Sequence, residues 1–243
     1  MSDGIRLNKF ISSSGFCSRR KADEWIASHK VYVNGVPADM GMRVFPDDQV
    51  VINGKIIQKQ DSFKLVAFYK PKGYACTAHR GDQSSIFQNF PLDTDLKYIG
   101  RLDKDSEGLL LLSNDGDLCN AIAKARNQHE KEYVVTVNRP ITADFLEGMS
   151  NGVRIYNKDK DTYVVTNPCK VYLQDENTFI IILTQGLNRQ IRRMCEHFDY
   201  RVKRLKRVRV MNITLNGMQS GEIRRVSEDE YQQLKQMLTQ KEK

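Results

Sequence analysis

The stretch of sequence that decides the fold runs from Ile99 to Gly116 and reads Ile-Gly-Arg-Leu-Asp-Lys-Asp-Ser-Glu-Gly-Leu-Leu-Leu-Leu-Ser-Asn-Asp-Gly. Its four consecutive leucines form a run of the length expected for a buried strand, and the Asn-Asp-Gly that follows is typical of a turn. We therefore predict that the polar residues before the leucines form a loop that enters a core strand. Such a loop can hold a side chain in a fixed direction, although Asp, Ser and Gly are also ordinary turn residues.

The composition indicates a basic protein of one large or two modest domains. The 243 residues include 38 Lys and Arg against 30 Asp and Glu, a net charge of +8 that favours a polyanionic partner. The five cysteines are odd in number and include no Cys-x-x-Cys pair, so we expect reduced thiols and no metal site. The N-terminal residues lack the pattern of a signal peptide and no apolar stretch is long enough to span a bilayer, which predicts a cytoplasmic protein.

Residues 5–57 show the pattern of a small α/β module. Leu7, Phe10 and Ile11 have helical spacing, and Ser18 can cap a second helix. Asn34-Gly35 and Asn53-Gly54, each between apolar residues, predict two hairpins. A cluster of basic residues on the helices would ordinarily be a solvated face; its members are Arg6, Lys9, Arg19, Arg20 and Lys21.

We interpret residues 58–64 as a linker and residues 65–243 as a second domain. Alternating or continuous apolar residues predict strands, and apolar residues at helical spacing predict helices. The strands are expected at 65–70, 130–137, 179–184 and 200–210, and the helices at 117–124, 141–149, 190–198 and after a capping box at 227–230. Residues 79–98 give no clear pattern, and the polar segment 154–168 is expected to be a surface loop or hairpin without chemistry.

Three segments carry a resemblance to a known family. Gly100-Arg-Leu-Asp103, followed by Asp105-Ser106 and the leucine run, resembles the signature of the RsuA-type pseudouridine synthases, with Ser106 keeping the hydroxyl of the usual Thr. Gln190-Ile-Arg-Arg-Met194 resembles the third active-site motif of that family. Residues 5–57 resemble the S4 RNA-binding domain. The fold class that this implies is α+β, with a small S4-like α/β module before a synthase domain that has a mostly antiparallel mixed sheet and flanking helices.

The resemblance also implies roles for individual residues. Asp103 would be catalytic, Tyr133 would stack on the target uracil, and Arg192 would pair with Asp103 and favour its ionised form. A plainer interpretation makes Tyr133 a core or sheet-face aromatic. Asp105 and Glu107 are assigned to turn structure and capping. Besides the five basic residues of the first module, the residues expected to contact RNA are Arg101, Leu102, Lys104, Arg189, Gln190, Ile191 and Arg193.

The reaction that the resemblance implies breaks the bond between ribose C1′ and uracil N1 and joins C1′ to C5. It needs no cofactor and no metal, and Asp103 would act either as nucleophile or as the base that removes a ribose proton. Leu187-Asn-Arg189 is most similar to the RluF branch. This similarity predicts large-subunit (23S) ribosomal RNA as substrate, with transfer RNA as a second possible substrate, and nothing requires more than a monomer.

Three alternatives stay open at this point. The protein could bind RNA through its S4-like module without catalysing a reaction, or it could be a synthase that acts on small-subunit ribosomal RNA. A glycoside hydrolase that uses Asp103 with Asp105 or Glu107 is disfavoured, because the sequence around them offers no sugar-stacking aromatics.

Overall fold

The computed structural model describes residues 4–58, 63–77, 79, 81–93, 95–123, 128–158 and 161–240. The chain divides into two compact units, residues 1–64 with 114–116 and residues 65–113 with 117–243. Each unit has its own apolar core. Most of the predicted linker, residues 59–62, lies outside the described residues. In the part of the chain that is described, no helix is long and apolar enough to cross a membrane.

The first unit is the predicted module of two helices and short strands. Ser18 Oγ accepts a hydrogen bond from the backbone N–H of Lys21 at 3.2 Å and so caps the second helix. Asn34 and Asn53 adopt positive φ at the two hairpin turns, as their Asn-Gly sequences predict. The elements are β1 (Ile5–Arg6), α1 (Leu7–Ser13), α2 (Arg19–Ala27), β2 (Val31–Val33), β3 (Val36–Pro37), β4 (Arg43–Val44), β5 (Val50–Ile52) and β6 (Lys55–Ile57).

The second unit is built on a mixed sheet in which nine strands are assigned among the described residues. Neighbouring strands are antiparallel except β9 and β15, which are parallel, so the predicted α+β class with a mostly antiparallel sheet is confirmed. The order is β13-β14-β10-β15-β9-β7-β17. The strands are β7 (Leu65–Lys70), β8 (Lys97–Ile99), β9 (Glu107–Ser113), β10 (Lys131–Val137), β13 (Lys170–Asp175), β14 (Thr178–Leu183), β15 (Val202–Val210), β16 (Ile213–Thr214) and β17 (Ile223–Arg225).

Strand β9 explains the run of four leucines, because both of its faces are buried. Leu109 and Leu111 pack on the side covered by α4 (Gly116–Ala123) and α7 (Glu228–Gln240), whereas Leu110 and Leu112 pack on the opposite side. All four leucines are 0% exposed. A strand buried on two faces needs apolar residues at every position instead of alternate ones. The predicted capping box opens α7, because Ser227 and Glu230 each accept a hydrogen bond from the other's backbone N–H.

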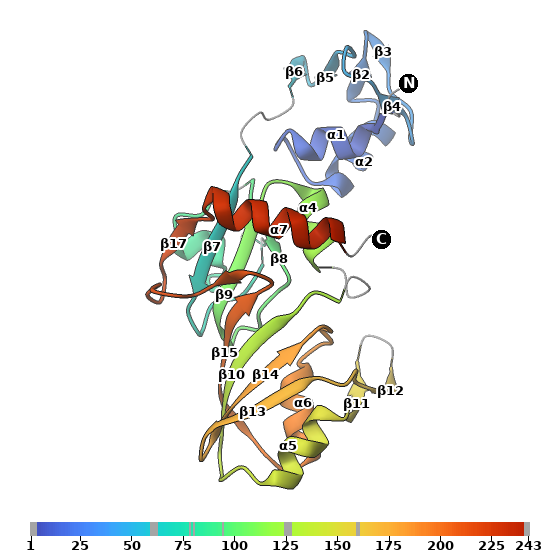
Figure 1. Cartoon of the computed structure of the whole chain (residues 1–243). Coiled ribbons are helices and arrows are strands. Elements are labelled where there is room, and N and C mark those ends of the chain that lie inside the picture. The colour runs from blue at the N-terminus through green and yellow to red at the C-terminus, as the bar shows by residue number, and fades with distance from the viewer. Residues whose placement is uncertain are drawn as a thin grey trace. The chain divides into compact units, whose positions relative to one another are not determined.

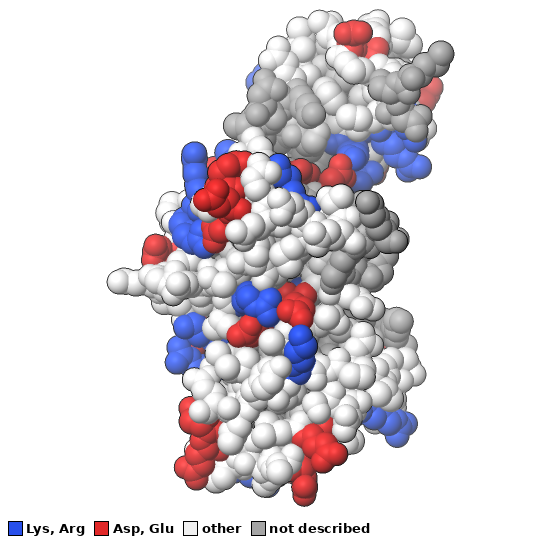
Figure 2. Space-filling model, in the orientation of Figure 1, with Lys and Arg blue, Asp and Glu red and all other residues white. Residues whose placement is uncertain are grey.

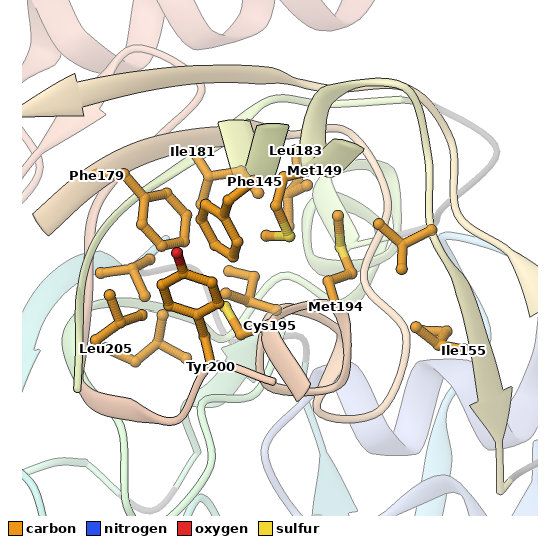
Figure 3. Packing of buried hydrophobic residues seen from close by; sticks show 14 residues of the cluster. Phe145, Met149, Ile155, Phe179, Ile181, Leu183, Met194, Cys195, Tyr200 and Leu205 are labelled. Carbon is orange, nitrogen blue, oxygen red and sulfur yellow. The ribbon is translucent and has the colours of Figure 1, made fainter. Parts of the chain in front are cut away.

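A separate core lies under α5 (Ala143–Ser150) and α6 (Gln190–His197). Figure 3 shows the ring of Phe145 next to those of Phe179 and Tyr200, whose centroids lie 5.3 and 4.3 Å away. The hydroxyl of Tyr200 donates to the carbonyl of Pro140 at 2.9 Å. This core holds α6 against β10 and β14, and it therefore fixes the residues at the start of α6. The hairpin of β11 (Arg154–Asn157) and β12 (Thr162–Val165) packs beside α6 (Figure 1).

The structure also contains elements that the sequence pattern missed. The unassigned stretch 79–98 holds the short helix α3 (Ile86–Asn89) and strand β8, and β13 was not predicted. Arg6 lies in β1 and not on a helix. Arg192 on α6 is buried, although it is charged. Arg207, within the predicted strand 200–210, is only 1% exposed although it is charged.

Candidate active site

Asp103 lies in the loop between β8 and β9, where the sequence places the polar residues before the leucine run. Its side chain is 36% exposed and lines an open pocket of about 520 Å³. Three segments form this pocket: the turn after β7, the Asp103 loop and the loop before α6. Its lining residues are Lys72, Gly73, Asp103, Lys104, Asp105 and Arg189. The fold thus brings the Gly-Arg-Leu-Asp motif and the segment before Gln-Ile-Arg-Arg to one place.

The turn after β7 holds the Asp103 loop from one side. The backbone N–H of Gly73 donates to the carbonyl of Lys104 at 2.7 Å. Lys70 is fully buried and its Nζ donates to the carbonyls of Pro71 at 2.8 Å and Ser106 at 2.7 Å. Burial lowers the pKa of Lys70 to about 8, although the negative charges of Asp103 and Asp105 oppose this shift. The Lys-Pro-Lys-Gly sequence therefore supports the loop as well as forming a turn.

Arg207 holds the same loop from the sheet. Its Nε donates to the carbonyl of Leu109 at 2.7 Å and its Nη2 to the carbonyl of Gly100 at 3.0 Å. The guanidinium therefore joins the two ends of the loop that carries Asp103. Arg207 lies opposite Gly108 in the parallel pairing of β15 with β9. A Cβ atom at Gly108 would lie 2.2 Å from the carbonyl oxygen of Arg207, so this approach of the two strands requires glycine.

The arginines near Asp103 do not make the predicted pairing. Among the described residues, Arg189 is the one that forms an ion pair with Asp103, with Nη1 3.8 Å from Oδ2. Arg192 instead donates through Nη2 to the carbonyl of Asp105 and to Ser106 Oγ, both at 3.1 Å. The same nitrogen lies 3.4 Å from Asp105 Oδ2. The predicted pair of Arg192 with Asp103 is therefore corrected, because the Asp105 carboxylate and the Ser106 hydroxyl occupy its guanidinium.

Asp105 was assigned to turn structure and capping, but its carboxylate also lies within ion-pair distance of both Arg189 and Arg192. Arg189 Nη1 lies 3.2 Å from each carboxylate oxygen of Asp105. Arg189 itself has a φ of 50°, in the left-handed region, directly before α6. No local pattern could have revealed this ion pair, because its partners are 84 residues apart in sequence.

Tyr133 lies on β10, opposite Arg207 on β15 and Ile181 on β14. Its half-buried ring packs against the core under α5 and α6 and also against the cluster that contains Leu102. Leu102 directly precedes Asp103 in the chain. The ring of Tyr133 is therefore part of the support under the Asp103 loop, and its partial exposure leaves room for a ligand contact.

Three of the residues expected to contact RNA have buried side chains. Leu102 is buried in a core cluster, Ile191 is buried under α6, and Gln190 is buried while accepting a hydrogen bond from the backbone N–H of Leu187 at 3.0 Å. Their side chains are packed within the protein, and the contact of these three residues with RNA stays a prediction. The remaining residues of that prediction are partly or fully exposed; they are Arg101, Lys104, Arg189 and Arg193 in the second unit and Arg6, Lys9, Arg19, Arg20 and Lys21 in the first.

The face that Figure 2 shows has no single large basic patch. Acidic and basic side chains lie next to one another there. Within the sheet, Arg204 pairs with Glu107 at 2.5 Å and Arg209 pairs with Glu132 at 2.8 Å. The face that Figure 2 shows therefore offers a polyanion no uniform basic surface.

Comparisons with known proteins agree with this geometry. Residues 64–197 match the family model described as RNA pseudouridylate synthase, and residues 5–50 match the S4 domain. A crystal structure described as pseudouridylate synthase superimposes with a TM-score of 0.69 at 26% identity, covering 95% of this chain and 99% of the other.

Two curated relatives show the same likeness along most of their length. The dual-specificity RNA pseudouridine synthase RluF of Escherichia coli (strain K12) is 48% identical over 228 residues, which are 93% of this chain and 77% of the relative. The ribosomal large subunit pseudouridine synthase B of Bacillus subtilis (strain 168) is 34% identical over 241 residues, 95% of each chain. This chain belongs to the RNA pseudouridylate synthase family.

Proposed function

We propose that this protein converts one uridine of large-subunit ribosomal RNA to pseudouridine and that Asp103 is its catalytic carboxylate. The observation that carries the proposal is the position of Asp103, which lines a pocket together with Lys72, Lys104 and Arg189. A carboxylate for the sugar and cations for the neighbouring phosphates are the groups that this isomerisation requires. The names of both relatives, one of which acts on the large ribosomal subunit, support the choice of RNA.

The reaction detaches the uracil at N1 from ribose C1′, turns it and joins it again through C5. Asp103 would start it, either by attacking C1′ or by removing a ribose proton, and both routes use the ionised carboxylate. The Arg189 guanidinium supplies positive charge beside this carboxylate. Because the target base must leave its stack to enter a pocket, a stacking partner is needed. We assign that part to Tyr133, where an aromatic face contributes about 1–3 kcal/mol.

Arg192 acts in this proposal through the loop and not through a direct contact with Asp103. Its bonds to Asp105 and Ser106 fix the residues that follow Asp103. Lys70 and Arg207 hold the same loop from two other sides. Three buried or nearly buried cations around one short loop give Asp103 a fixed direction before RNA binds, which lowers the entropic cost of the reaction.

We further propose that residues 5–57 bind RNA as an S4 domain, that residues 65–243 form the catalytic domain, and that the protein works as a cytoplasmic monomer. The exposed basic residues of α2 support RNA binding by the first domain, since phosphate contacts hold an RNA in place without reading its sequence. Transfer RNA would be a second substrate, in line with the dual specificity that the name of the Escherichia coli relative states.

The test is release of tritium from RNA labelled at uridine C5, with wild-type protein and the Asp103→Asn variant side by side. We expect release from large-subunit ribosomal RNA by the wild type, and none by the variant at equal RNA affinity. Small-subunit ribosomal RNA and transfer RNA are assayed in parallel to define the substrate. Undiminished turnover by Asp103→Asn would refute the role of Asp103. Binding without any release by the wild type would favour an RNA-binding protein that lacks the activity.

A further inference from the structure

The hairpin of β11 and β12 presents an unusual outer face. Ile155 and Val164 point to the core under α5 and α6, whereas Tyr156 and Tyr163 lie directly opposite each other on the solvent side. Tyr163 is 60% exposed and Tyr156 is 38% exposed. The sequence pattern of this segment gave no reason to expect chemistry, because its polar residues resemble an ordinary surface hairpin. The structure shows that the hairpin gathers two aromatic rings on one exposed face.

The two rings are arranged so that one of them stays open. Their centroids are 5.4 Å apart with an interplanar angle of 64°, and the Tyr156 hydroxyl donates to the Asp161 carboxylate. The guanidinium carbon of Arg154 lies 4.5 Å from the centroid of the Tyr163 ring. Tyr156 is thus fixed by its hydrogen bond, while Tyr163 and Arg154 form a mostly exposed aromatic and cationic pair. Such pairs are the usual platform for unstacked RNA bases.

This face is connected to the pocket by direct contacts. Arg193, in the first turn of α6, donates through Nη1 to the carbonyl of Tyr156 at 2.5 Å and through Nη2 to Asn188 Oδ1 at 2.9 Å. Asn188 is the neighbour of Arg189, which lines the pocket. A second contact joins the backbone N–H of Asn167, after β12, to Gln185 Oε1 in the loop before α6 at 3.1 Å. The hairpin and the pocket are therefore parts of one continuous surface.

We propose that the outer face of this hairpin, formed by Arg154, Tyr156 and Tyr163, binds an unpaired nucleotide of the RNA that flanks the target uridine. A base that neighbours a flipped uridine loses a stacking partner, and the Tyr163 ring replaces it. Arg154 and Arg193 supply positive charge along the path from the pocket to the hairpin, where the flanking phosphates must lie. This proposal rests on the proposed function only in naming ribosomal RNA as the ligand. The binding of an unpaired base by the hairpin is argued from the hairpin itself.

Stacking on Tyr163 is tested in the full chain with Tyr163→Ala and with Tyr172→Ala as matched control. Tyr172 is 53% exposed on β13, and among the described residues its ring contacts no other ring and no cation. The probe is unmodified large-subunit ribosomal RNA transcribed in vitro, used for filter binding and for tritium release. We expect Tyr163→Ala to raise Kd and KM about tenfold with kcat unchanged, as the loss of one stacked base implies. Tyr172→Ala should stay within about twofold of wild type.

Two further variants separate stacking from a merely structural role. Tyr163→Phe keeps the ring and should bind within about twofold of wild type. Arg154→Ala should reduce the slope of log Kd against log salt by about 0.7, the value for one lost phosphate contact on a single strand. Far-UV circular dichroism and the urea midpoint of unfolding show whether each variant is folded. If Tyr163→Ala is unfolded, the salt slope of Arg154→Ala decides, and an unchanged slope overturns the proposal.

The outcomes for this inference and for the proposed function are distinct. If the wild type releases tritium and Tyr163→Ala binds RNA as tightly as Tyr172→Ala does, the hairpin proposal is wrong and the function stands. If the wild type releases no tritium but Tyr163→Ala weakens RNA binding about tenfold, the hairpin proposal stands and the proposed function fails. Weak binding by Tyr163→Phe as well would show that the ring is not what the RNA contacts, and would overturn the proposal.

Discussion

Arg189 and Arg192 lie within reach of the same carboxylate, yet their surroundings differ. The side chain of Arg189 is 42% exposed and pairs with Asp103 and Asp105, whereas that of Arg192 is 9% exposed and also bonds to Ser106 and to the carbonyl of Val202. A surface ion pair contributes little to stability, but hydrogen bonds from a buried charged group contribute about 1.5–3 kcal/mol each. We therefore assign Arg189 mainly to the substrate and Arg192 mainly to the loop.

This assignment predicts different effects of two substitutions. Arg189→Ala should lower kcat/KM in the tritium assay by about tenfold or more while changing the free energy of unfolding by less than about 0.5 kcal/mol. Arg192→Met should lower the free energy of unfolding by about 2 kcal/mol, because the groups it bonds lose a buried partner, and it should also lower kcat. Urea unfolding and steady-state kinetics on both variants check this. A stability loss in Arg189→Ala equal to that in Arg192→Met would contradict the division of roles.

Because of Lys70, the free energy of unfolding of the second unit should rise with pH in the alkaline range. Its pKa is about 8 in the folded protein and near 10.5 when unfolded, so between these values the unfolded chain binds more protons. The contribution of Lys70 to the free energy of unfolding therefore rises with pH between pH 8 and 10.5. Below pH 8 the buried ammonium group is charged, and its burial destabilises the folded state in full. The free energy of unfolding of the wild type relative to Lys70→Met should rise by about 2 kcal/mol from pH 7.5 to 9.5.

The measurement for Lys70 is urea unfolding followed by far-UV circular dichroism at the two pH values. Tryptophan fluorescence is unsuitable, since the single tryptophan, Trp25, lies in the first unit. Other titrating groups are common to both proteins and cancel in the difference. A difference that stays constant with pH would show that Lys70 is charged across the whole range.

At the scale of elements, the close approach of β9 to β15 depends on Gly108. This residue has a φ of 112°, and an added Cβ would meet three backbone atoms of Arg207 at less than 3 Å. Gly108→Ala should cost more than about 4 kcal/mol, because backbone on both strands has to move. Gly217 also has a positive φ of 74° but has open space around it, so Gly217→Ala should cost only about 1–2 kcal/mol. Equal costs in urea unfolding would show that the strands can separate without penalty.

The elements also show what the sequence could and could not reveal. The leucine run of β9, the cap of α2 by Ser18 and the capping box of α7 were predictable, because each signal lies within a few residues. Short elements such as α3 and β8 span too few residues for a period to appear. Asp103 could be identified through the family motif, but the residues that hold its loop in place could not. Arg207 bonds to Gly100 across 107 residues, and only the strand order brings them together.

At the scale of the whole molecule, RNA affinity should depend on salt through both units. Arg19 and Arg20 are exposed on α2, and Lys30 and Lys55 are equally exposed elsewhere in the first unit. If α2 contacts phosphates, Arg19→Ala/Arg20→Ala should flatten the slope of log K against log salt by about 1.4 to 1.8, as two lost contacts imply. The matched double variant Lys30→Ala/Lys55→Ala should leave the slope unchanged. Equal slopes in the two double variants would remove the phosphate contacts from α2.

The parallel pairing of β9 with β15 has a consequence for the time at which the enzyme becomes active. The hydrogen bond from Arg207 to the carbonyl of Leu109 joins residues 98 apart in sequence, and the described chain between them forms β10 to β14 and the helices α4, α5 and α6. Contacts this distant form late, since closing so long a loop costs entropy before any contact is made. During synthesis on the ribosome, the Asp103 loop therefore lacks its hydrogen bonds from Arg207 until β15 has emerged. A nascent or truncated chain that lacks β15 can carry a complete S4 domain and still leave every uridine unmodified.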